Sequence, residues 1–328
     1  MNDISLTVRQ ESWPIRGAFR ISRGAKTAAE VVVVEVTRGP FTGRGECVPY
    51  ARYGESLDSV TGEIERVRKT IEGGVSAERL LSLLPSGAAR NAVDCALWDL
   101  AAKASGRTVA DLLGVPAPGP QISAYTLSLD SAEAMGAAAK LQADRPLLKL
   151  KLGGAGDVER VAAVRENAPR SRIIVDANEA WTPAMIADFD ADMARLGVEL
   201  IEQPLPADKD EVLADIEHSV PLCADESCHD LSTLDEVAPL YDYINVKLDK
   251  TGGLTEALRL VGAARDLGLG VMVGCMLGTS LAMAPALLLG SSARYIDLDG
   301  PLLLDRDREP GLRFEGSVVH PPQPALWG

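Results

Sequence analysis

The sequence has few aromatic residues: Phe, Trp and Tyr together make up 4% of its 328 residues. We therefore expect a core packed mainly with Ala, Val, Leu and Ile. Basic residues are also in deficit, with 33 Lys and Arg against 47 Asp and Glu, which gives a net charge of −14. Because nucleic acids and anionic membrane surfaces are bound through basic patches, we expect neither as a partner.

Long hydrophobic runs are missing as well. No apolar run reaches the roughly 18 residues that a membrane helix needs, and the first 20 residues lack the apolar stretch of a secretory signal. The five cysteines are odd in number and widely spread, which favours free thiols over a disulfide framework. These features predict a cytoplasmic location.

Strand and helix patterns divide the chain into three predicted parts. VVVVEV at 31–36 is β-branched and predicts a strand, whereas apolar residues at helical spacing follow from 59 to about 104. Three prolines at 116–120 indicate a boundary. We predict an α+β capping domain over 1–118, a barrel over 119–304 and a C-terminal segment, 305–328, that returns to the cap.

Short apolar strand patterns alternate with amphipathic helical patterns after the prolines. The eight predicted strands are Ile122–Leu127, Leu147–Leu152, Ile173–Asp176, Leu200–Glu202, Leu222–Asp225, Tyr243–Lys247, Val271–Gly274 and Tyr295–Leu298. Such alternation is typical of parallel βα units. The predicted fold class is α/β, a (β/α)7β TIM-like barrel with an α+β cap.

Polar or glycine residues end these strands at regular intervals of 22 to 27 residues. They are Lys151, Asp176, Glu202, Asp225, Lys247, Gly274 and Asp297. Each interval fits one helix, one strand and two loops, so these residues share the carboxyl end of a parallel barrel. Active sites of this fold are built at that end.

Three of these residues, Asp176, Glu202 and Asp225, are carboxylates on consecutive strands. Converging carboxylates repel one another unless a cation neutralises them, and an all-oxygen ligand set favours Mg²⁺. The alternative is that each acid separately ends a strand or caps a helix. Cys223, Cys228, His218 and His229 could suggest zinc, but they lack a second properly spaced ligand pair.

Two lysine positions flank the acids. Lys149 and Lys151 lie on one face of a strand, where each charge should lower the pKa of the other and favour a general base. Lys247 ends the sixth strand, across the barrel from the second. Opposed bases suit removal of a proton from one face of a carbon and its return from the other. Alternatively, the lysines only pair with the carboxylates, and Lys250 is a weaker candidate.

Four further acidic or amide residues are candidates for the site. Asp297 and Asp299 could bind a substrate ammonium group or form the turn before Gly300. Asn178 and Glu226 follow two of the predicted ligands and could orient them.

The ordered motifs resemble those of the enolase superfamily, in particular its muconate-lactonizing subgroup. The matching segments are KLKL at 149–152, VDANEAW at 175–181, EQPLP at 202–206, CADES at 223–227 and NVKLDKTGG at 245–253. GECVPY at 45–50 and AARNAVDCALWDLAAK at 88–103 are similar to the capping domain of that family. The motif DLDGP at 297–301 is similar to that of the dipeptide epimerase branch.

This resemblance implies a Mg²⁺-dependent isomerase that inverts the C-terminal residue of a dipeptide. The implied reaction is a two-base 1,1-proton transfer through an ene-diolate, with L-Ala-L-Glu and L-Ala-D-Glu as substrates in murein peptide recycling. Lys151 and Lys247 would be the opposed acid and base, assisted by Lys149. Mg²⁺ would bind Asp176, Glu202 and Asp225.

The resemblance also implies the substrate contacts. Asp297 and Asp299 would hold the ammonium group, and Arg23 of an N-terminal loop, with Arg20 as runner-up, would hold the glutamate side chain. The predicted substrate site is completed by Thr126, Gly274 and Met276.

Several alternatives stay open on the sequence, and a different dipeptide preference is the first of them. An o-succinylbenzoate synthase or an N-acylamino acid racemase would use the same metal and lysines on a substrate without an ammonium group. A non-catalytic binder of small anions is disfavoured, because every core residue of the motifs is present. Oligomeric state is not readable, although a homo-oligomer is compatible with the chain.

Overall fold

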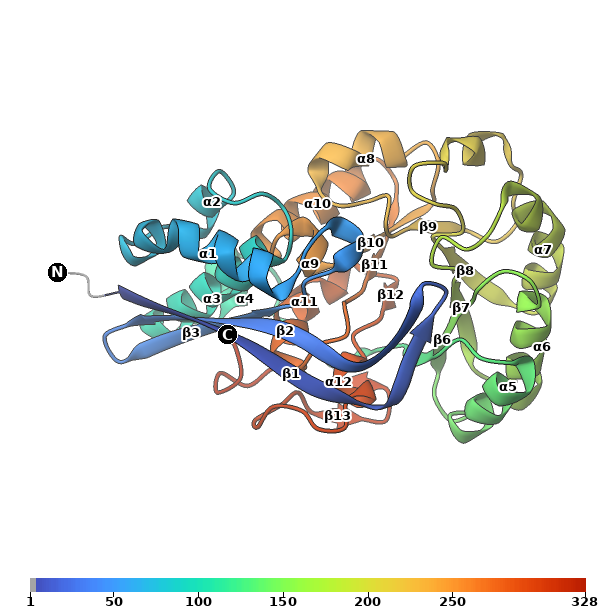
Figure 1. Cartoon of the computed structure of the whole chain (residues 1–328), viewed down its shortest axis with the longest axis horizontal. Helices are drawn as coiled ribbons and strands as arrows, with labels where there is room; N and C mark the ends of the chain where they lie inside the picture. Colours follow the sequence, from blue (N-terminus) through green and yellow to red (C-terminus); the bar gives the residue numbers. More distant parts are fainter. Residues whose placement is uncertain (1–3) are drawn as a thin grey trace.

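Residues 4–328 are described by the structure, a computed structural model (Figure 1). The first sheet is antiparallel and consists of β1 (Ile4–Ile21), β2 (Gly24–Arg38) and β3 (Phe41–Cys47). β1 and β2 form a long hairpin that extends from the N-terminal helices to the barrel (Figure 1). The hairpin thereby connects the cap to the mouth of the barrel.

The central strand β2 is buried on both faces. Val32, Val34 and Val36 pack into the core of the cap, whereas Val31 and Val33 pack into the core that continues into the barrel. Successive side chains of a strand point to opposite faces, so an uninterrupted valine run serves two cores at once. This is why the segment reads VVVVEV rather than alternating with polar residues.

Four α-helices and one 3₁₀ turn complete the cap, and a polar residue or a glycine precedes each α-helix. Ser56 forms a capping box at the start of α1, and Gly106, in the left-handed conformation, follows α3. The helical segments are η1 (Ala51–Tyr53), α1 (Leu57–Glu72), α2 (Ala77–Leu80), α3 (Ala88–Ser105) and α4 (Val109–Leu113). Residues 115–120, which contain the three prolines, have no regular structure.

Eight parallel strands form the second sheet, in sequence order from β5 to β12. They are β5 (Tyr125–Leu127), β6 (Leu147–Lys151), β7 (Arg172–Asp176), β8 (Val198–Glu202), β9 (Leu222–Ala224), β10 (Tyr243–Val246), β11 (Gly270–Val273) and β12 (Tyr295–Ile296). Ala124 N donates to Ile296 O at 2.7 Å, so the first and last strands also meet. The predicted α/β barrel class is confirmed.

Helical segments follow the barrel strands. They are α5 (Ala132–Leu141), α6 (Asp157–Asn167), α7 (Pro183–Arg195), η2 (Glu211–Asp215), α8 (Leu231–Val237), α9 (Leu248–Thr251), α10 (Leu254–Asp266), α11 (Ser280–Ala286), η3 (Leu287–Ser292) and α12 (Gly300–Leu303). α5 to α8 lie on the outside of the barrel (Figure 1), whereas α9, α11 and α12 contact the cap. The connection between β8 and β9 is a loop whose helical part is the 3₁₀ segment η2. Within residues 4–328, no helix has the length and apolarity required to cross a bilayer.

The first predicted barrel strand, Ile122–Leu127, is only partly correct. Its start forms β4 (Gln121–Ile122), which pairs with β14 (Val318–Val319) in a small sheet that also contains β13 (Phe314–Glu315). Ser123 breaks the run, because its N–H donates to Ser317 O and its hydroxyl accepts from Leu298 N. The barrel strand therefore begins only at Tyr125.

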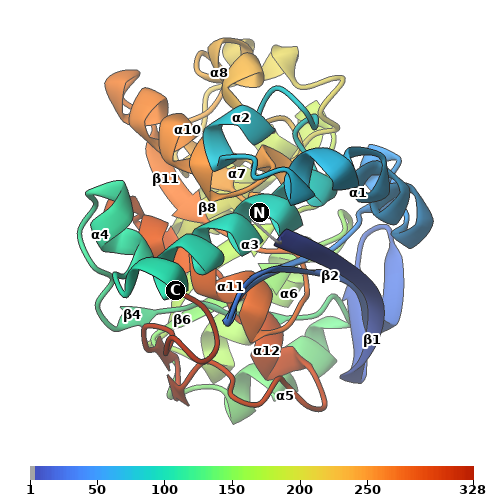
Figure 2. The same ribbon diagram turned by 90° about the vertical axis from the view of Figure 1, so that its left-hand side faces the viewer.

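The last residues of the chain pack against α3 of the cap (Figure 2). The Trp327 indole is buried and donates to Cys95 O at 3.0 Å, and Gly328 N donates to Asp99 at 2.8 Å. Arg44 donates to Leu326 O at 2.7 Å. These contacts join the C-terminus to β3 and α3.

The close packing of β3 on α3 yields a stability prediction. A Cβ at Gly43 would collide with the backbone of Ala96 and Leu100, so we expect Gly43→Ala to lower the free energy of unfolding by roughly 1–3 kcal/mol. Gly62 in α1 is the matched control, since a Cβ there meets nothing and Ala favours a helix by about 1 kcal/mol. Urea denaturation of both variants measures the difference, and equal midpoints would contradict the packing argument.

Candidate active site

A cavity of about 460 Å³ lies between the tip of the β1–β2 hairpin and the carboxyl ends of the barrel strands. The hairpin contributes some of residues 19–30, and the segment after β3 contributes Val48 and Tyr50. Lys151 and Lys247, from opposite sides of the barrel, line the same cavity. The predicted pair of opposed lysines therefore faces one cavity.

The three predicted metal ligands stand at the ends of three neighbouring barrel strands, and one of them, Asp225, lines the floor of the cavity. Asp176 and Glu202 are the last residues of β7 and β8 and are in register with Lys151 of β6. Asp225 directly follows β9, and all three carboxylates are at most 2% exposed. The parallel register therefore brings together residues that are about 25 positions apart in the sequence.

Ammonium groups lie against each of these carboxylates. Lys151 Nζ is 2.5 Å from Asp176 Oδ2, and Lys247 Nζ is 2.5 Å from Asp225 Oδ2. Lys149 Nζ is 2.6 Å from Glu202 Oε2. Within residues 4–328, no three His, Cys, Asp or Glu side chains are arranged as a metal cluster.

The chemistry of the donors nevertheless fits a hard cation. All three acids present oxygen from adjacent strands, the ligand type that Mg²⁺ prefers. Two further oxygens beside them, Asn178 Oδ1 and Glu226 Oε2, are buried without a hydrogen-bond partner. Asn178 N also donates to Asp176 Oδ1 at 2.9 Å, which fixes the orientation of that carboxylate.

The buried charges shift the pKa of the acids in opposite directions. Burial favours the neutral form of Asp176, but Lys151 and Lys149 outweigh it and lower its pKa to about 2. The pKa of Glu202 is raised by burial and by the charge of Asp176. Burial and the charges of Asp225 and Asp176 raise the pKa of Glu226 to about 7.

The prediction that a neighbouring lysine lowers the pKa of Lys149 is wrong. Burial lowers the pKa of Lys149, but Asp297, Glu202 and Asp176 raise it by more, so it lies well above its usual value. The expectation considered the neighbouring lysine alone. The sequence could not show that three carboxylates converge on the same ammonium group.

Asp297 and Asp299 are buried beside Thr126, and neither lines the cavity described above. Lys149 Nζ is 2.7 Å from Asp297 Oδ2, and Thr126 N donates to Asp299 Oδ2 at 2.6 Å. Thr126 Oγ1 also donates to Asp297 at 3.4 Å. Burial and the neighbouring Asp297 raise the pKa of Asp299 to about 7. The structure thus brings the predicted acidic pair and Thr126 together.

Gly274 and Met276 are positioned by the segment after β11. A Cβ at Gly274 would collide with the Asn245 side chain, whose Nδ2 donates to Glu202 at 2.7 Å, so glycine is needed for this close approach. Met276 lines the cavity. The end of this segment is anchored where Thr279 N donates to the buried Glu46 of the cap at 2.7 Å.

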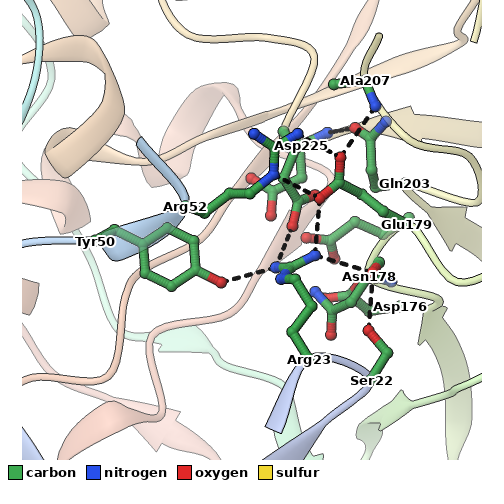
Figure 3. Close-up of polar contacts among 12 residues, drawn as sticks. Ser22, Arg23, Tyr50, Arg52, Asp176, Asn178, Glu179, Gln203, Ala207 and Asp225 are labelled. Atoms are coloured by element: carbon green, nitrogen blue, oxygen red, sulfur yellow. Dashed lines mark hydrogen bonds and ion pairs between the residues drawn. The ribbon is translucent and has the colours of Figure 1, made fainter. Parts of the chain in front are cut away.

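Arg23 reaches from the hairpin tip into the mouth of the barrel (Figure 3). Its Nη2 donates to Glu226 at 2.6 Å and to the Tyr50 hydroxyl at 2.7 Å, and its Nη1 donates to Asn178 O at 2.9 Å. Arg20 instead pairs with the exposed Asp130 and does not line the cavity. Of the two arginines, Arg23 is therefore the one that lies at the cavity.

Two family models match the chain: Enolase C-terminal domain-like over residues 132–325, and the mandelate racemase/muconate lactonizing enzyme N-terminal domain over residues 3–114. The chain belongs to the mandelate racemase/muconate-lactonizing enzyme family of the enolase superfamily. The family predicted from the motifs is therefore confirmed.

Members of this family are similar to the chain over nearly its whole length. The L-Ala-D/L-Glu epimerase of Escherichia coli K12 is 45% identical, covering 96% of this chain and 99% of that protein. The N-acetyl-D-glutamate racemase of Pseudoalteromonas is 44% identical, covering 91% of this chain and 95% of that protein.

Solved structures of the family are also similar. An enolase family member from Agrobacterium tumefaciens with homology to dipeptide epimerases, with bound sodium and L-Ala-L-Glu and an ordered loop, has a TM-score of 0.97. It is 52% identical and covers 99% of this chain and 100% of that chain. The dipeptide epimerase of Cytophaga hutchinsonii, in complex with Mg and D-Ala-L-Val, has a TM-score of 0.91 at 26% identity, covering 98% and 94% of the two chains.

Two residues of this family member's site were missed or underrated on the sequence. Glu179 accepts from both Arg23 and Arg52, and its place beside Asn178 in VDANEAW was the available signal. Lys250 is 1% exposed and donates to Asp225 Oδ1 at 2.7 Å and Asn245 O at 2.9 Å. It follows its strand as expected, but the turn of α9 brings it back to the site.

The contacts of Arg23 predict how firmly the hairpin tip is held. Arg23→Met removes charged hydrogen bonds to largely buried partners, so we expect cleavage after Lys26 by endoproteinase Lys-C to become at least about tenfold faster. Arg20→Met is the control, because its exposed ion pair contributes little. Mass spectrometry of the fragment that ends at Lys26 measures both rates. Unchanged cleavage of the Arg23 variant would contradict the anchoring.

Proposed function

We propose that the protein is an isomerase that epimerises dipeptides at the α-carbon of the C-terminal residue. The observation that carries this proposal is the pair Lys151 and Lys247, which reach one cavity from the second and sixth barrel strands. L-Ala-L-Glu and L-Ala-D-Glu are the proposed substrates. The E. coli relative and the Agrobacterium structure bound to L-Ala-L-Glu support this choice.

Each lysine would act on one face of the substrate. The amine of one lysine takes the α-proton, and the C–H electron pair passes into the adjacent carboxylate to form an ene-diolate. The other lysine, protonated, returns a proton to the opposite face, so the α-carbon is inverted. The reverse reaction exchanges the roles of Lys151 and Lys247.

Asp176, Glu202 and Asp225 would hold Mg²⁺, whose chemistry is to stabilise the negative charge that develops on the substrate carboxylate oxygens. The Cytophaga dipeptide epimerase, solved with Mg, supports this assignment. Asn178 and Glu226 would keep the ligands oriented. Lys149, between Glu202 and Asp297, would add a fixed positive charge beside the reacting carboxylate.

The two ends of the dipeptide would meet opposite charges. Arg23 would bind the glutamate side chain at the hairpin, and Asp297 and Asp299, with Thr126, would hold the ammonium group. Gly274 and Met276 would border the bound chain. We further propose that the enzyme acts in the cytoplasm in murein peptide recycling, where its five free cysteines are compatible with a reducing environment.

Deuterium exchange tests the two-base assignment. In D₂O, wild-type enzyme should label and invert the C-terminal α-carbon of L-Ala-L-Glu, and EDTA should stop the reaction until Mg²⁺ is restored. Lys151→Ala and Lys247→Ala should each reduce epimerisation by at least about 10³-fold, in the range found for loss of a general acid or base. Each variant should retain exchange for only the epimer that faces its remaining lysine, as read by mass spectrometry. Full activity in either variant would refute the assignment.

A second candidate function is racemisation of N-acylated glutamate. It is favoured by the 44% identity to the N-acetyl-D-glutamate racemase of Pseudoalteromonas. Such a substrate has no ammonium group, so the acidic pair Asp297 and Asp299 would have nothing to bind. An o-succinylbenzoate synthase would also act on a substrate without an ammonium group.

A substrate panel separates these candidates. Asp297→Asn and Asp299→Asn should raise KM for L-Ala-L-Glu by roughly 10- to 100-fold, because each removes a charged partner of the ammonium group. KM for N-acetylglutamate is the internal control and should change much less in the same variants. Steady-state kinetics on both substrates measure the difference. Equal changes would remove the argument for a dipeptide.

A further inference from the structure

Lys247 is not held by the sheet alone, because it stands at the start of a very short helix. It immediately precedes α9, which has only four residues, Leu248–Thr251. A helix of this length has no stability of its own. The direction of the Lys247 side chain therefore depends on what holds α9 in place.

The barrel holds one side of α9. Lys250 Nζ donates to Asp225 Oδ1 at 2.7 Å and to Asn245 O at 2.9 Å. These partners belong to the metal-ligand strand end and to β10. They connect α9 to the floor of the active site.

The cap holds the other side of α9, through Asp249. This side chain is 6% exposed, and its Oδ1 accepts from Val48 N at 3.0 Å and from Asn91 Nδ2 at 2.8 Å. Val48 follows β3 and lines the cavity, whereas Asn91 lies on α3. A single carboxylate oxygen thus connects the cavity wall, the cap helix and the turn that carries the base.

Lys151 is held differently. It ends β6, where it is in register with Asp176 of β7, and β5 pairs with the other edge of the same strand. The position of Lys151 is therefore set by the barrel sheet itself. The two lysines depend on different supports, although they face the same cavity.

We infer that Asp249 is a positioning residue through which the cap aligns Lys247, and only Lys247, with the substrate. This inference rests on the proposed two-base function. It assigns the capping domain a part in proton transfer on one face of the α-carbon, in addition to its part in forming the cavity. Losing the Asp249 contacts should let α9 shift and should affect one direction of exchange selectively.

The test measures α-proton exchange of the two epimers separately in D₂O. The epimer that retains exchange in Lys247→Ala reports on Lys151, and the one that retains it in Lys151→Ala reports on Lys247. In Asp249→Ala, exchange of the epimer that reports on Lys247 should slow, so that the ratio of the two exchange rates shifts by at least about tenfold. A displacement of the base by up to about 1 Å is enough for such a loss.

Asp249→Asn is the conservative variant. Burial raises the pKa of Asp249 to about 7, and a neutral amide oxygen can accept both hydrogen bonds. We expect this variant to restore most of the wild-type ratio. A ratio that stays shifted in Asp249→Asn would overturn the role of the two hydrogen bonds.

Asp94→Ala is the matched control. Asp94 is another buried acid that links α3 to the barrel, through Thr255 of α10, with Thr255 N donating at 3.1 Å. It should lower thermal stability without shifting the ratio. An unchanged ratio in Asp249→Ala, or the same shift in Asp94→Ala, would overturn the inference. Failure of the proposed function is distinguishable, since wild-type enzyme would then exchange neither epimer.

Discussion

Charge neutralisation inside the barrel is the constraint on which the rest of the structure depends. Parallel strands bring Asp176, Glu202 and Asp225 to one buried place, where an unpaired carboxylate would cost several kcal/mol of desolvation. Lys151 and Lys247 lie against two of these acids and also face the cavity. The groups that balance the buried charge are therefore the groups that can carry protons.

The cap completes the site through contacts between residues that are far apart in the sequence. The β1–β2 hairpin brings Arg23 to the barrel mouth, and the segment after β3 supplies Val48 and Tyr50 to the cavity wall. Because β2 has one face in each core, the hairpin cannot shift without disturbing both. The cap is thus a structural part of the active site rather than an added cover.

Much of the barrel was predictable because its strands are short apolar runs that end in a charged residue. The strands that end at Asp176 and Glu202 follow this pattern. The run Ile122–Leu127, in contrast, is divided at Ser123, which donates to Ser317 O and accepts from Leu298 N. This interruption of the strand depends on residues about 175 to 195 positions away in the sequence. No local pattern can reveal it.

The sequence by itself determined the family, the order of the strands and the identity of the charged residues at their ends, because these features are local or are ordered along the chain. Only the tertiary structure decided which charges meet. The three carboxylates around Lys149, the contact of Arg23 with Glu226, and the contact of Asp249 with the cap all join distant segments. These interactions depend on distances and desolvation in the folded chain, and the spacing of residues along the sequence predicts neither.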